Sequence, residues 1–170
     1  PRPDAVAGTG RPGQRSRGQD EEGMAAEVLL PNMLAGPVFW RNIADDAAYC
    51  SVVRAYNDWL ADFCSHAPSR LLGVAYIPFE TVEGAVAEIR RAAQRGLRST
   101  LIQSKPPFGR WHDPEWAPVW EALVGTGLPQ VCTPYAVPQR TGPRPPPRAD
   151  TRPLAVAVDL VPGTPQMADE

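Results

Sequence analysis

Apolar and polar positions along residues 27–133 follow two alternating periods. Short runs that are apolar almost throughout, as expected of buried strands, alternate with segments whose apolar residues recur every three or four positions, as in amphipathic helices. Strands are predicted at Glu27–Leu30, Leu71–Ile77, Arg98–Gln103 and Leu128–Thr133. Helices are predicted at 45–65, at 81–95 and from Pro114 to Gly125.

This alternation predicts a parallel sheet, because each helix returns the chain to the side from which the previous strand started. Leu71–Ile77 carries no charged residue, which is typical of a parallel strand that is covered on both faces. The carboxyl ends of all the strands then lie along one edge, where the following loops can share a site. We therefore predict an α/β fold with about four parallel strands.

Local signals mark the ends of the predicted helices. Asp45 or Asp46 suits the positively polarised start of the first helix. Gly96 follows the second helix, where a left-handed residue commonly ends a helix. Asp113 precedes Pro114, the arrangement of an N-cap followed by proline at the first helical position.

The helical periods also predict which side chains are buried. Four polar residues of the second helix are predicted to face solvent: Glu88, Arg90, Arg91 and Gln94. Three tryptophans on helical stripes are predicted to lie in the core: Trp59, Trp116 and Trp120. Trp40 and Trp111 lie in loops, so a role in ligand binding stays open for them. Asn57 and Asp58 are predicted to be structural residues that hydrogen-bond a neighbouring loop.

Both ends of the chain depart from this pattern. Of the 170 residues, 21 are proline, and they are concentrated toward the ends. Residues 1–23 contain no aromatic residue and cannot bury enough apolar surface to offset the entropy of ordering. Residues 134–170 are rich in proline and show no period. We predict a folded unit over residues 24–133 between a disordered N-terminal segment and a disordered tail.

Charge and cysteine content exclude several classes of function. The formal net charge is −2, which disfavours a nucleic-acid partner held by neutralised phosphates. No apolar run approaches the ~20 residues of a membrane helix, so a membrane partner is not expected. The three cysteines, Cys50, Cys64 and Cys132, form no CxxC pair. Buried, reduced thiols in a cytoplasmic protein are therefore expected.

Four stretches taken together resemble the amidohydrolase-related family, the metal-dependent hydrolases that include the aminocarboxymuconate-semialdehyde decarboxylase type. They are RAYNDWLADFC, APSRLLGVAYIP, AVAEIRRAAQRGLRSTLI and DPEWAPVWEALVGTGLP. The resemblance spans about Glu27 to Thr133, and the ordered set carries it rather than any single motif. It implies that the four strands are part of a (β/α)8 TIM barrel.

The resemblance also implies a divalent metal, often zinc, at the carboxyl ends of the strands. The family holds it with a His-x-His pair on the first strand, histidines on two later strands and an aspartate near the end. This chain has only two histidines, His66 and His112, and no His-x-His. Thr133 stands where the family's strand after the GLP turn ends in a histidine. No metal ligand can be carried over, and no cofactor is expected for the chain as it stands.

One hypothesis for the missing ligand is a change of reading frame near Gln130. One permitted codon choice for residues 131–136 encodes Leu-His-Thr-Leu-Arg when it is read from its third base. That sequence is of the kind that the family shows at this place. The tail over residues 134–170 would then be a frameshifted translation.

The loop over residues 104–113 contains the candidate substrate-binding residues. Lys105, Arg110 and His112 follow the third predicted strand, on the side where active sites of parallel sheets form. Cationic groups there could pair with a substrate carboxylate. Solvated loop charges without a chemical role are the competing interpretation.

Three hypotheses for function remain open. The first is a fragment of a metal-dependent hydrolase or carboxy-lyase that acts on a small carboxylic or cyclic substrate and is inactive alone. The second is a non-enzymatic remnant or interaction piece that docks on an intact homologue. The third is a complete small α/β domain that binds a small molecule without metal. Four strands leave the barrel open, so self-association through its exposed edges is expected.

Overall fold

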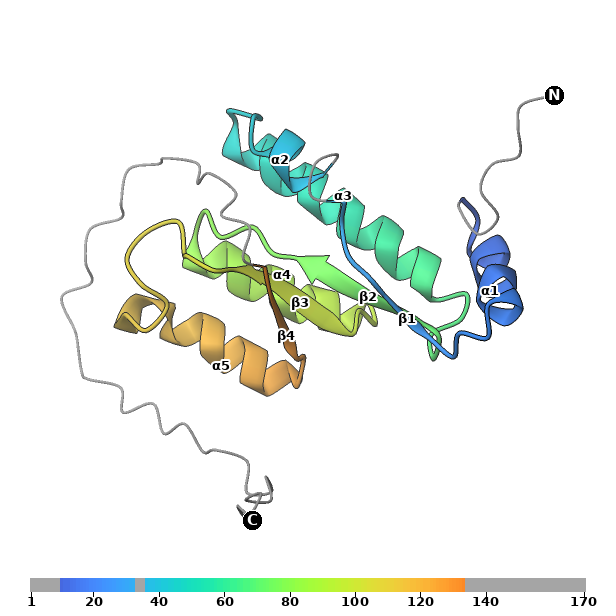
Figure 1. Ribbon diagram of the computed structural model, residues 1–170. Coiled ribbons are helices and arrows are strands. Elements are labelled where there is room, and N and C mark those ends of the chain that lie inside the picture. The colour runs from blue at the N-terminus through green and yellow to red at the C-terminus, as the bar shows by residue number, and fades with distance from the viewer. Residues whose placement is uncertain (1–9, 33–35, 134–170) are drawn as a thin grey trace, which may run out of the picture.

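The computed structural model describes residues 10–32 and 36–133 of the chain (Figure 1). Four parallel strands form one sheet in the order β1-β2-β3-β4. The strands are β1 (Glu27–Leu29), β2 (Leu71–Tyr76), β3 (Ser99–Gln103) and β4 (Gln130–Thr133). The helices are α1 (Pro12–Glu21), α2 (Pro37–Trp40), α3 (Asp46–Cys64), α4 (Val82–Gln94), the 3₁₀ helix η1 (Pro114–Trp116) and α5 (Ala117–Thr126). The sheet curls into half of a barrel, which confirms the predicted α/β class and the partial (β/α)8 architecture.

Helices α3 and α4 begin where their capping residues predict. The carboxylate of Asp45 accepts a hydrogen bond from the main-chain N–H of Ala48 at 2.7 Å. The hydroxyl of Thr81 accepts one from the N–H of Gly84 at 3.0 Å. These bonds satisfy N–H groups that have no partner within the helix. Gly96 follows α4 with a φ of +85°, as expected of a residue that ends a helix.

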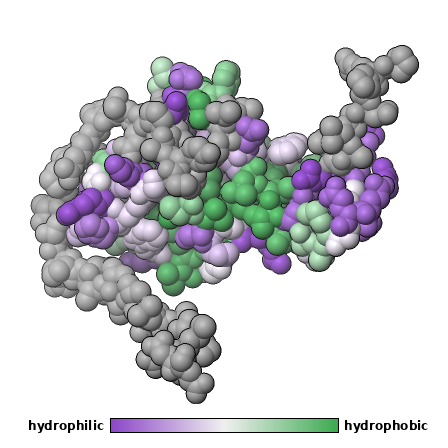
Figure 2. Space-filling model, viewed as in Figure 1, coloured by the Kyte–Doolittle hydropathy of each residue, from purple (hydrophilic) through white to green (hydrophobic). Residues whose placement is uncertain are grey.

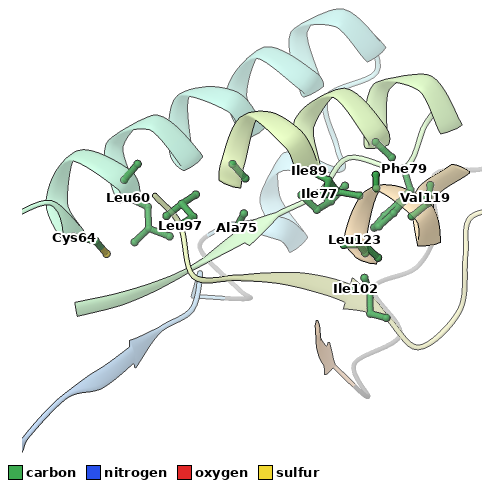
Figure 3. Packing of buried hydrophobic residues seen from close by; sticks show 14 of the residues in the cluster. Leu60, Cys64, Ala75, Ile77, Phe79, Ile89, Leu97, Ile102, Val119 and Leu123 are labelled. Carbon is green, nitrogen blue, oxygen red and sulfur yellow. The ribbon is translucent and has the colours of Figure 1, made fainter. Parts of the chain in front are cut away.

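The main core lies between the sheet and the helices on its outer side (Figure 3). Helices α3, α4 and α5 each direct apolar side chains onto β2 and β3. The labelled members of this cluster are Leu60, Cys64, Ala75, Ile77, Phe79, Ile89, Leu97, Ile102, Val119 and Leu123. Burial of this apolar surface is the main force that holds the layers together.

Gly73 lets α3 approach the sheet closely. A Cβ at this position would lie 2.7 Å from the side chain of Leu97 and 3.0 Å from the sulfur of Cys64. Both distances are at or below the shortest that packed carbon atoms tolerate, so the middle of β2 has no room for a side chain.

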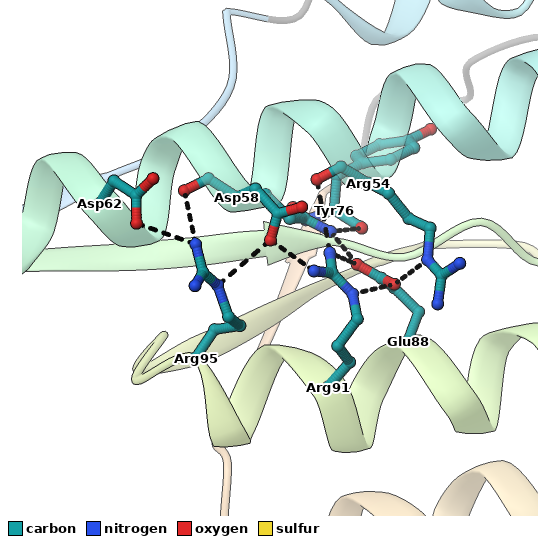
Figure 4. A network of polar contacts seen from close by, with 8 residues as sticks. Arg54, Asp58, Asp62, Tyr76, Glu88, Arg91 and Arg95 are labelled. Carbon is teal, nitrogen blue, oxygen red and sulfur yellow. Dashed lines mark hydrogen bonds and ion pairs between the residues drawn. The ribbon is translucent and has the colours of Figure 1, made fainter.

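A buried carboxylate joins α3 to α4 (Figure 4). Glu88 of α4 is only 2% exposed, so the prediction that it faces solvent is wrong. Its oxygens accept hydrogen bonds from Arg91 at 2.7 Å, from Asn57 at 2.7 Å and from Arg54 at 3.3 Å. Glu88 lies beside the apolar stripe of α4, at a position that faces α3 rather than water. The cationic and amide donors around it offset the cost of burying its charge.

Further ion pairs continue along the same two helices. Asp58 of α3 pairs with Arg91 and, at 3.1 Å, with Arg95. Asp62 pairs with Arg95 at 2.8 Å. Asp58 therefore has the structural role predicted for it, but its partners lie on a helix rather than in a loop. Arg91 is half-buried, against the prediction, whereas Arg90 and Gln94 are exposed as predicted.

Helix α1 (Pro12–Glu21) corrects the prediction of disorder for the described part of residues 1–23. Arg15 donates two hydrogen bonds of 2.6 Å to the carboxylate of Glu27, at the start of β1. Arg70 pairs with Asp20 at 2.6 Å and also donates to the carbonyl of Met24 at 2.9 Å. The segment is ordered by partners elsewhere in the chain, which its own composition cannot reveal. Residues 1–9 and the predicted tail over 134–170 lie outside the described residues.

The tryptophan predictions hold for two of three helical positions. Trp116 is buried and Trp120 is half-buried. Trp59 is 55% exposed, so its predicted place in the core is wrong. Its ring packs instead along the outside of α3, between Tyr56 at 6.0 Å and Phe63 at 5.4 Å. The buried face of α3 is therefore narrower than its apolar pattern predicts, and Trp59 lies outside it.

All three cysteines are free, as predicted, but only Cys64 is buried. Burial raises the pKa of the Cys64 thiol above its ordinary value. Cys50 is half-buried and Cys132 is exposed on β4. None of the helices described in the structure has both the length and the apolar character needed to cross a membrane.

Candidate functional site

The carboxyl ends of three neighbouring strands bring polar residues to one edge of the sheet. β2 ends at Tyr76, β3 at Gln103 and β4 at Thr133. Tyr76 is paired in register with Leu101, and Gln103 with Thr133. Since residues two apart on a strand share a face, Tyr76 and Gln103 lie on the inner face of the half-barrel together with Leu101. This is the end of the sheet at which barrel enzymes place their active sites.

A buried hydrogen-bond network occupies this edge. The side-chain amide of Gln103 donates to the hydroxyl of Tyr76 at 3.2 Å. The hydroxyl of Tyr49, from α3, hydrogen-bonds the same Tyr76 hydroxyl. Burial raises the pKa of both tyrosines well above the ordinary value. Both hydroxyls therefore remain protonated at physiological pH.

Sequence reasoning did not single out Tyr49, Tyr76 or Gln103. The available signal was positional: Tyr76 and Gln103 are the last residues of two adjacent parallel strands. Their pairing with each other depends on the register between β2 and β3, which composition does not reveal. Tyr49 reaches them from a helix that begins after the preceding strand.

Asn57 fixes the position of Tyr76 on the sheet edge. Its Oδ1 accepts a hydrogen bond from the main-chain N–H of Tyr76 at 3.0 Å, and its Nδ2 donates to the Tyr76 carbonyl at 2.8 Å. β1 pairs with β2 only as far as Gly73. At Tyr76, three residues further along β2, the Asn57 side chain supplies the two hydrogen bonds that a neighbouring strand would otherwise make. Asn57 is thus structural, as predicted, but its partners are a strand and Glu88 rather than a loop.

Three indole groups hold the loop between β3 and η1. Trp111 donates to the carbonyl of Gln103 at 2.9 Å, and Trp116 donates to the carbonyl of Phe108 at 3.3 Å. Trp120 donates to the carbonyl of Trp111 at 2.8 Å. Trp111 therefore serves the loop's own structure. Trp40, the other loop tryptophan, packs against Tyr56 and Tyr76 with ring centroids 5.1 and 5.8 Å apart.

The candidate binding residues of this loop are arranged around Asp113. The main-chain N–H of Arg110 donates to the Asp113 carboxylate at 2.8 Å, and its guanidinium lies 3.4 Å away. His112 Nε2 lies 4.0 Å from the same carboxylate. The hydrogen bond from Arg110 is the main cause of a lowered pKa for Asp113. The structure thus brings Arg110 and His112 together; Lys105 is exposed near the start of the loop.

Asp113 is turned toward this loop and not toward the helix that it precedes. Asp113 occupies the N-cap position before Pro114, as predicted, but its side chain makes no capping hydrogen bond to η1. Gly109 has a φ of +62°, and a Cβ there would lie 2.6 Å from the Asp113 carboxylate. The glycine therefore allows the tight turn that places Asp113 against Arg110.

The described residues do not fit a divalent metal. Within residues 10–32 and 36–133, no three histidine, cysteine or carboxylate side chains come close enough to hold an ion. His66 follows α3 and lies against Gly13 of α1, at the amino-terminal end of β2. His112 lies beyond the carboxyl end of β3. The two histidines are thus at opposite ends of the sheet, and strand ends occupied by tyrosine, glutamine and threonine offer poor metal donors.

Several solved structures with a similar fold are decarboxylases of aromatic acids. The 2,6-dihydroxybenzoate decarboxylase from Rhizobium matches with a TM-score of 0.56 and 24% identity, over 68% of this chain and 37% of that chain. The 5-carboxyvanillate decarboxylase from Sphingomonas paucimobilis matches with a TM-score of 0.54 and 24% identity, over 69% and 34%. A dihydroxybenzoic acid decarboxylase from Polaromonas sp. JS666, with bound manganese and the inhibitor 2-nitroresorcinol, has a TM-score of 0.56 and 25% identity, over 69% and 36%.

The chain therefore spans little more than a third of the length of these structures. No curated protein sequence matches it. The sequence model of the family described as Amidohydrolase matches residues 4–161. This match covers most of the chain and agrees with the half-barrel architecture, so the chain belongs to the amidohydrolase family.

Proposed function

We propose that this chain is part of a metal-dependent enzyme of the amidohydrolase family, a hydrolase or carboxy-lyase acting on a small carboxylic or cyclic substrate, and that it is inactive alone. One observation carries the proposal: three strands reach the edge where the barrel's active site belongs, and they end in Tyr76, Gln103 and Thr133. The side chains of Tyr76 and Gln103 can orient a substrate through hydrogen bonds but are poor ligands for a catalytic ion.

The complete protein requires a divalent metal, with zinc as the family's usual ion. The manganese bound in the Polaromonas decarboxylase structure supports a divalent ion but not zinc in particular. Because the described residues do not fit such an ion, its ligands belong to parts of the complete barrel beyond them. We derive no catalytic step through the metal from this chain.

The substrate class rests on the loop after β3. Lys105, Arg110 and His112 are exposed there, beyond the carboxyl end of a central strand. The Arg110 guanidinium lies 3.4 Å from Asp113 and is 74% exposed, so it stays accessible to a substrate carboxylate. A 2,6-dihydroxybenzoate decarboxylase solved in complex with 2,6-dihydroxybenzoate makes aromatic acids the first compounds to test. The partner proposed is thus a small molecule, not a nucleic acid or a membrane, in a cytoplasmic protein.

The alternative is a non-enzymatic interaction piece that docks on an intact homologue. Val28 of β1 and Leu30, the residue after the strand, are exposed apolar residues that favour it, because a monomer in solution does not usually leave such residues uncovered. Under this alternative the chain would bind a full-length relative and would not contribute side chains to catalysis.

Metal analysis combined with an activity assay tests the proposal. The purified 170-residue chain is dialysed against zinc or manganese and then analysed for bound metal. It is then incubated with 2,6-dihydroxybenzoate, with and without a chelator. We expect less than stoichiometric metal and no turnover. Chelator-sensitive turnover by the isolated chain would contradict the proposal, and binding to a full-length homologue without any turnover would favour the alternative.

The reading-frame hypothesis has its own test at the level of the gene. A shift near Gln130 predicts that a neighbouring frame encodes a histidine at the end of β4 and continues with family-like text. The family match runs to residue 161, past this point, and thus gives the hypothesis no support. Sequencing of the genomic DNA decides the matter: a single frame through this region, with no family-like text in another, rejects the shift.

A further inference from the structure

Helix α1 is joined to the rest of the fold without apolar side chains. Its ten residues, PGQRSRGQDE, contain no apolar residue except Pro12 and two glycines. No residue of α1 belongs to the two apolar clusters found among the described residues. In Figure 2 the region of α1, at the right, is mostly hydrophilic, and an apolar region over β1 adjoins it. The hydrophobic effect, which holds α3, α4 and α5 on the sheet, therefore contributes little to the attachment of α1.

Two arginines attach α1 instead. Arg15 of α1 donates two hydrogen bonds of 2.6 Å to the carboxylate of Glu27, at the start of β1. Arg70, which precedes β2, pairs with Asp20 of α1 at 2.6 Å and donates to the carbonyl of Met24 at 2.9 Å. The side chain of Arg15 is 37% exposed and that of Asp20 is 65% exposed. Dissolved ions can therefore reach both pairs and screen them.

The buried side of α1 adds a cost rather than another bond. Gln19 is 2% exposed, and neither polar atom of its side-chain amide has a hydrogen-bond partner among the described residues. The same holds for the hydroxyl oxygen of Ser16, one turn earlier. The Gln19 amide lies near enough to Glu27 to help lower the pKa of that carboxyl, but not within hydrogen-bond distance. Buried polar groups without partners weaken the contact that buries them.

Helix α1 cannot keep its helical form once it leaves the sheet. Isolated helices shorter than about 12 residues are marginal in water, and this helix has ten residues, two of them glycine. β1 does not depend on α1 in the same way. The N–H of Glu27 donates to the carbonyl of Arg70 at 2.8 Å, β1 pairs with β2, and Leu29 packs against the main core. Undocking and unfolding of α1 are thus a single event that leaves the sheet in place.

We infer that α1 is an electrostatic latch at the amino-terminal end of the sheet, which opens as one unit when salt screens its two arginine anchors. Ionic strength thereby sets the balance between the closed and the open chain. Opening uncovers the Glu27 carboxylate, whose side chain is 10% exposed in the closed form, and releases the Arg70 guanidinium. The inference depends only on the contacts of α1, not on the proposed function, because the candidate site lies at the opposite end of the strands.

Hydrogen exchange of the full chain in increasing sodium chloride is the first test. The pH is held constant, and each amide rate is taken relative to its intrinsic rate. Between 0.01 M and 1 M salt the screening length falls from about 30 Å to about 3 Å. We expect the protection of the α1 amides to fall at least ~tenfold over this range while the amides of β2 and β3 keep theirs. Protection of α1 that does not respond to salt would overturn the inference. So would an α1 that is unprotected at 0.01 M salt, or one that loses protection only together with β2 and β3.

Three variants separate the anchors from a general effect of charge. Arg15→Gln should lower the protection of α1 at least ~tenfold at 0.01 M salt and weaken its dependence on salt. Arg17→Gln is the matched control, because Arg17 is an exposed arginine of the same helix without an ion pair to a described residue. It should change the protection of α1 less than ~twofold. Gln19→Met replaces the unpartnered amide with an apolar chain of equal length and should raise the protection. Equal effects of the two arginine substitutions would overturn the inference. Loss of protection in Gln19→Met would also overturn it, because the amide would then be an anchor itself.

Discussion

The side-chain amide of Asn57 hydrogen-bonds both the N–H and the carbonyl of Tyr76. One helical residue thereby completes the edge of β2 beyond the last residue paired with β1. The same Nδ2 also donates to Glu88 at 2.7 Å, so one buried amide links α3, α4 and the sheet. The Tyr76 hydroxyl, which hydrogen-bonds both Tyr49 and Gln103, is held at the barrel mouth through this connection.

Replacement of Asn57 should therefore be among the most destabilising polar substitutions in the chain. Asn57→Ala removes three buried hydrogen bonds and leaves the main chain of Tyr76 and one oxygen of Glu88 short of a partner, at a cost of roughly 2–4 kcal/mol. Urea unfolding followed by circular dichroism measures the change. Asn42→Ala is the control, because Asn42 is exposed and makes a single bond to the Val38 carbonyl. Equal effects of the two substitutions would show that the Asn57 link is unimportant.

Gly73 and Gly125 predict opposite responses to the same substitution. Gly73→Ala should destabilise the fold by roughly 1–3 kcal/mol, because the new methyl group meets Leu97 and Cys64 in a packed core. Gly125 lies within α5, and a Cβ there meets nothing within 4 Å. Gly125→Ala should therefore stabilise the chain by about 0.5–1 kcal/mol. The same shift in melting temperature for both variants would contradict the packing described around β2.

The attachment of α1 should weaken in acid. Hydrogen bonds from Arg15 lower the pKa of Glu27. Because the folded-state pKa lies below that of the unfolded chain, the stabilisation is complete above the ordinary carboxyl pKa of about 4.3 and is lost as the pH falls through the folded-state value. The protection of the α1 amides against hydrogen exchange, taken relative to the intrinsic exchange rate at each pH, should thus fall between mildly acidic pH and pH values below about 4.3.

Glu27→Gln separates this ion pair from general acid effects. The variant should show faster exchange of α1 even at neutral pH and no further acceleration of α1 in acid relative to the rest of the chain. A pH dependence of α1 that is the same in both proteins would assign the effect to other groups.

Trp116 and Trp59 should differ strongly in their importance to stability. Trp116 is fully buried among aromatic rings, with Phe108 stacked at 4.6 Å and Trp111 at 4.9 Å. Trp116→Ala should cost roughly 3–5 kcal/mol through the cavity that it leaves. Trp59→Ala should cost well under half of that, because its ring lies mostly in solvent. Thermal melts of the two variants decide whether the tryptophans have the roles that their burial indicates.

The fold was predictable from the sequence because its signals are local. Apolar periods define the strands and helices, and Asp45 and Gly96 act within a few residues of their own positions. The same reasoning failed where a partner comes from far along the chain. Glu88 is a polar residue next to the apolar stripe of α4. It is buried only because Arg54 and Asn57 of α3 approach it and donate hydrogen bonds to it.

The candidate site was predictable only in part for the same reason. Arg110 and His112 are near neighbours in sequence, and they do lie together around Asp113. The Tyr76–Gln103 pair depends on the register between two strands. The order of α1 depends on contacts with Glu27 and Arg70, which lie outside that segment. Predictions that depend on residues of a single segment were confirmed more often than predictions that depend on contacts between two segments.

The indole hydrogen bonds have a mechanical consequence for the end of the sheet. Trp111 and Trp120 connect the carbonyl of Gln103 to the buried side of α5 in two successive steps. The loop after β3 is thus coupled to its following helix and cannot swing out alone as a flap. The turn at Asp113 is therefore expected to keep its position at this end of the sheet when a ligand binds.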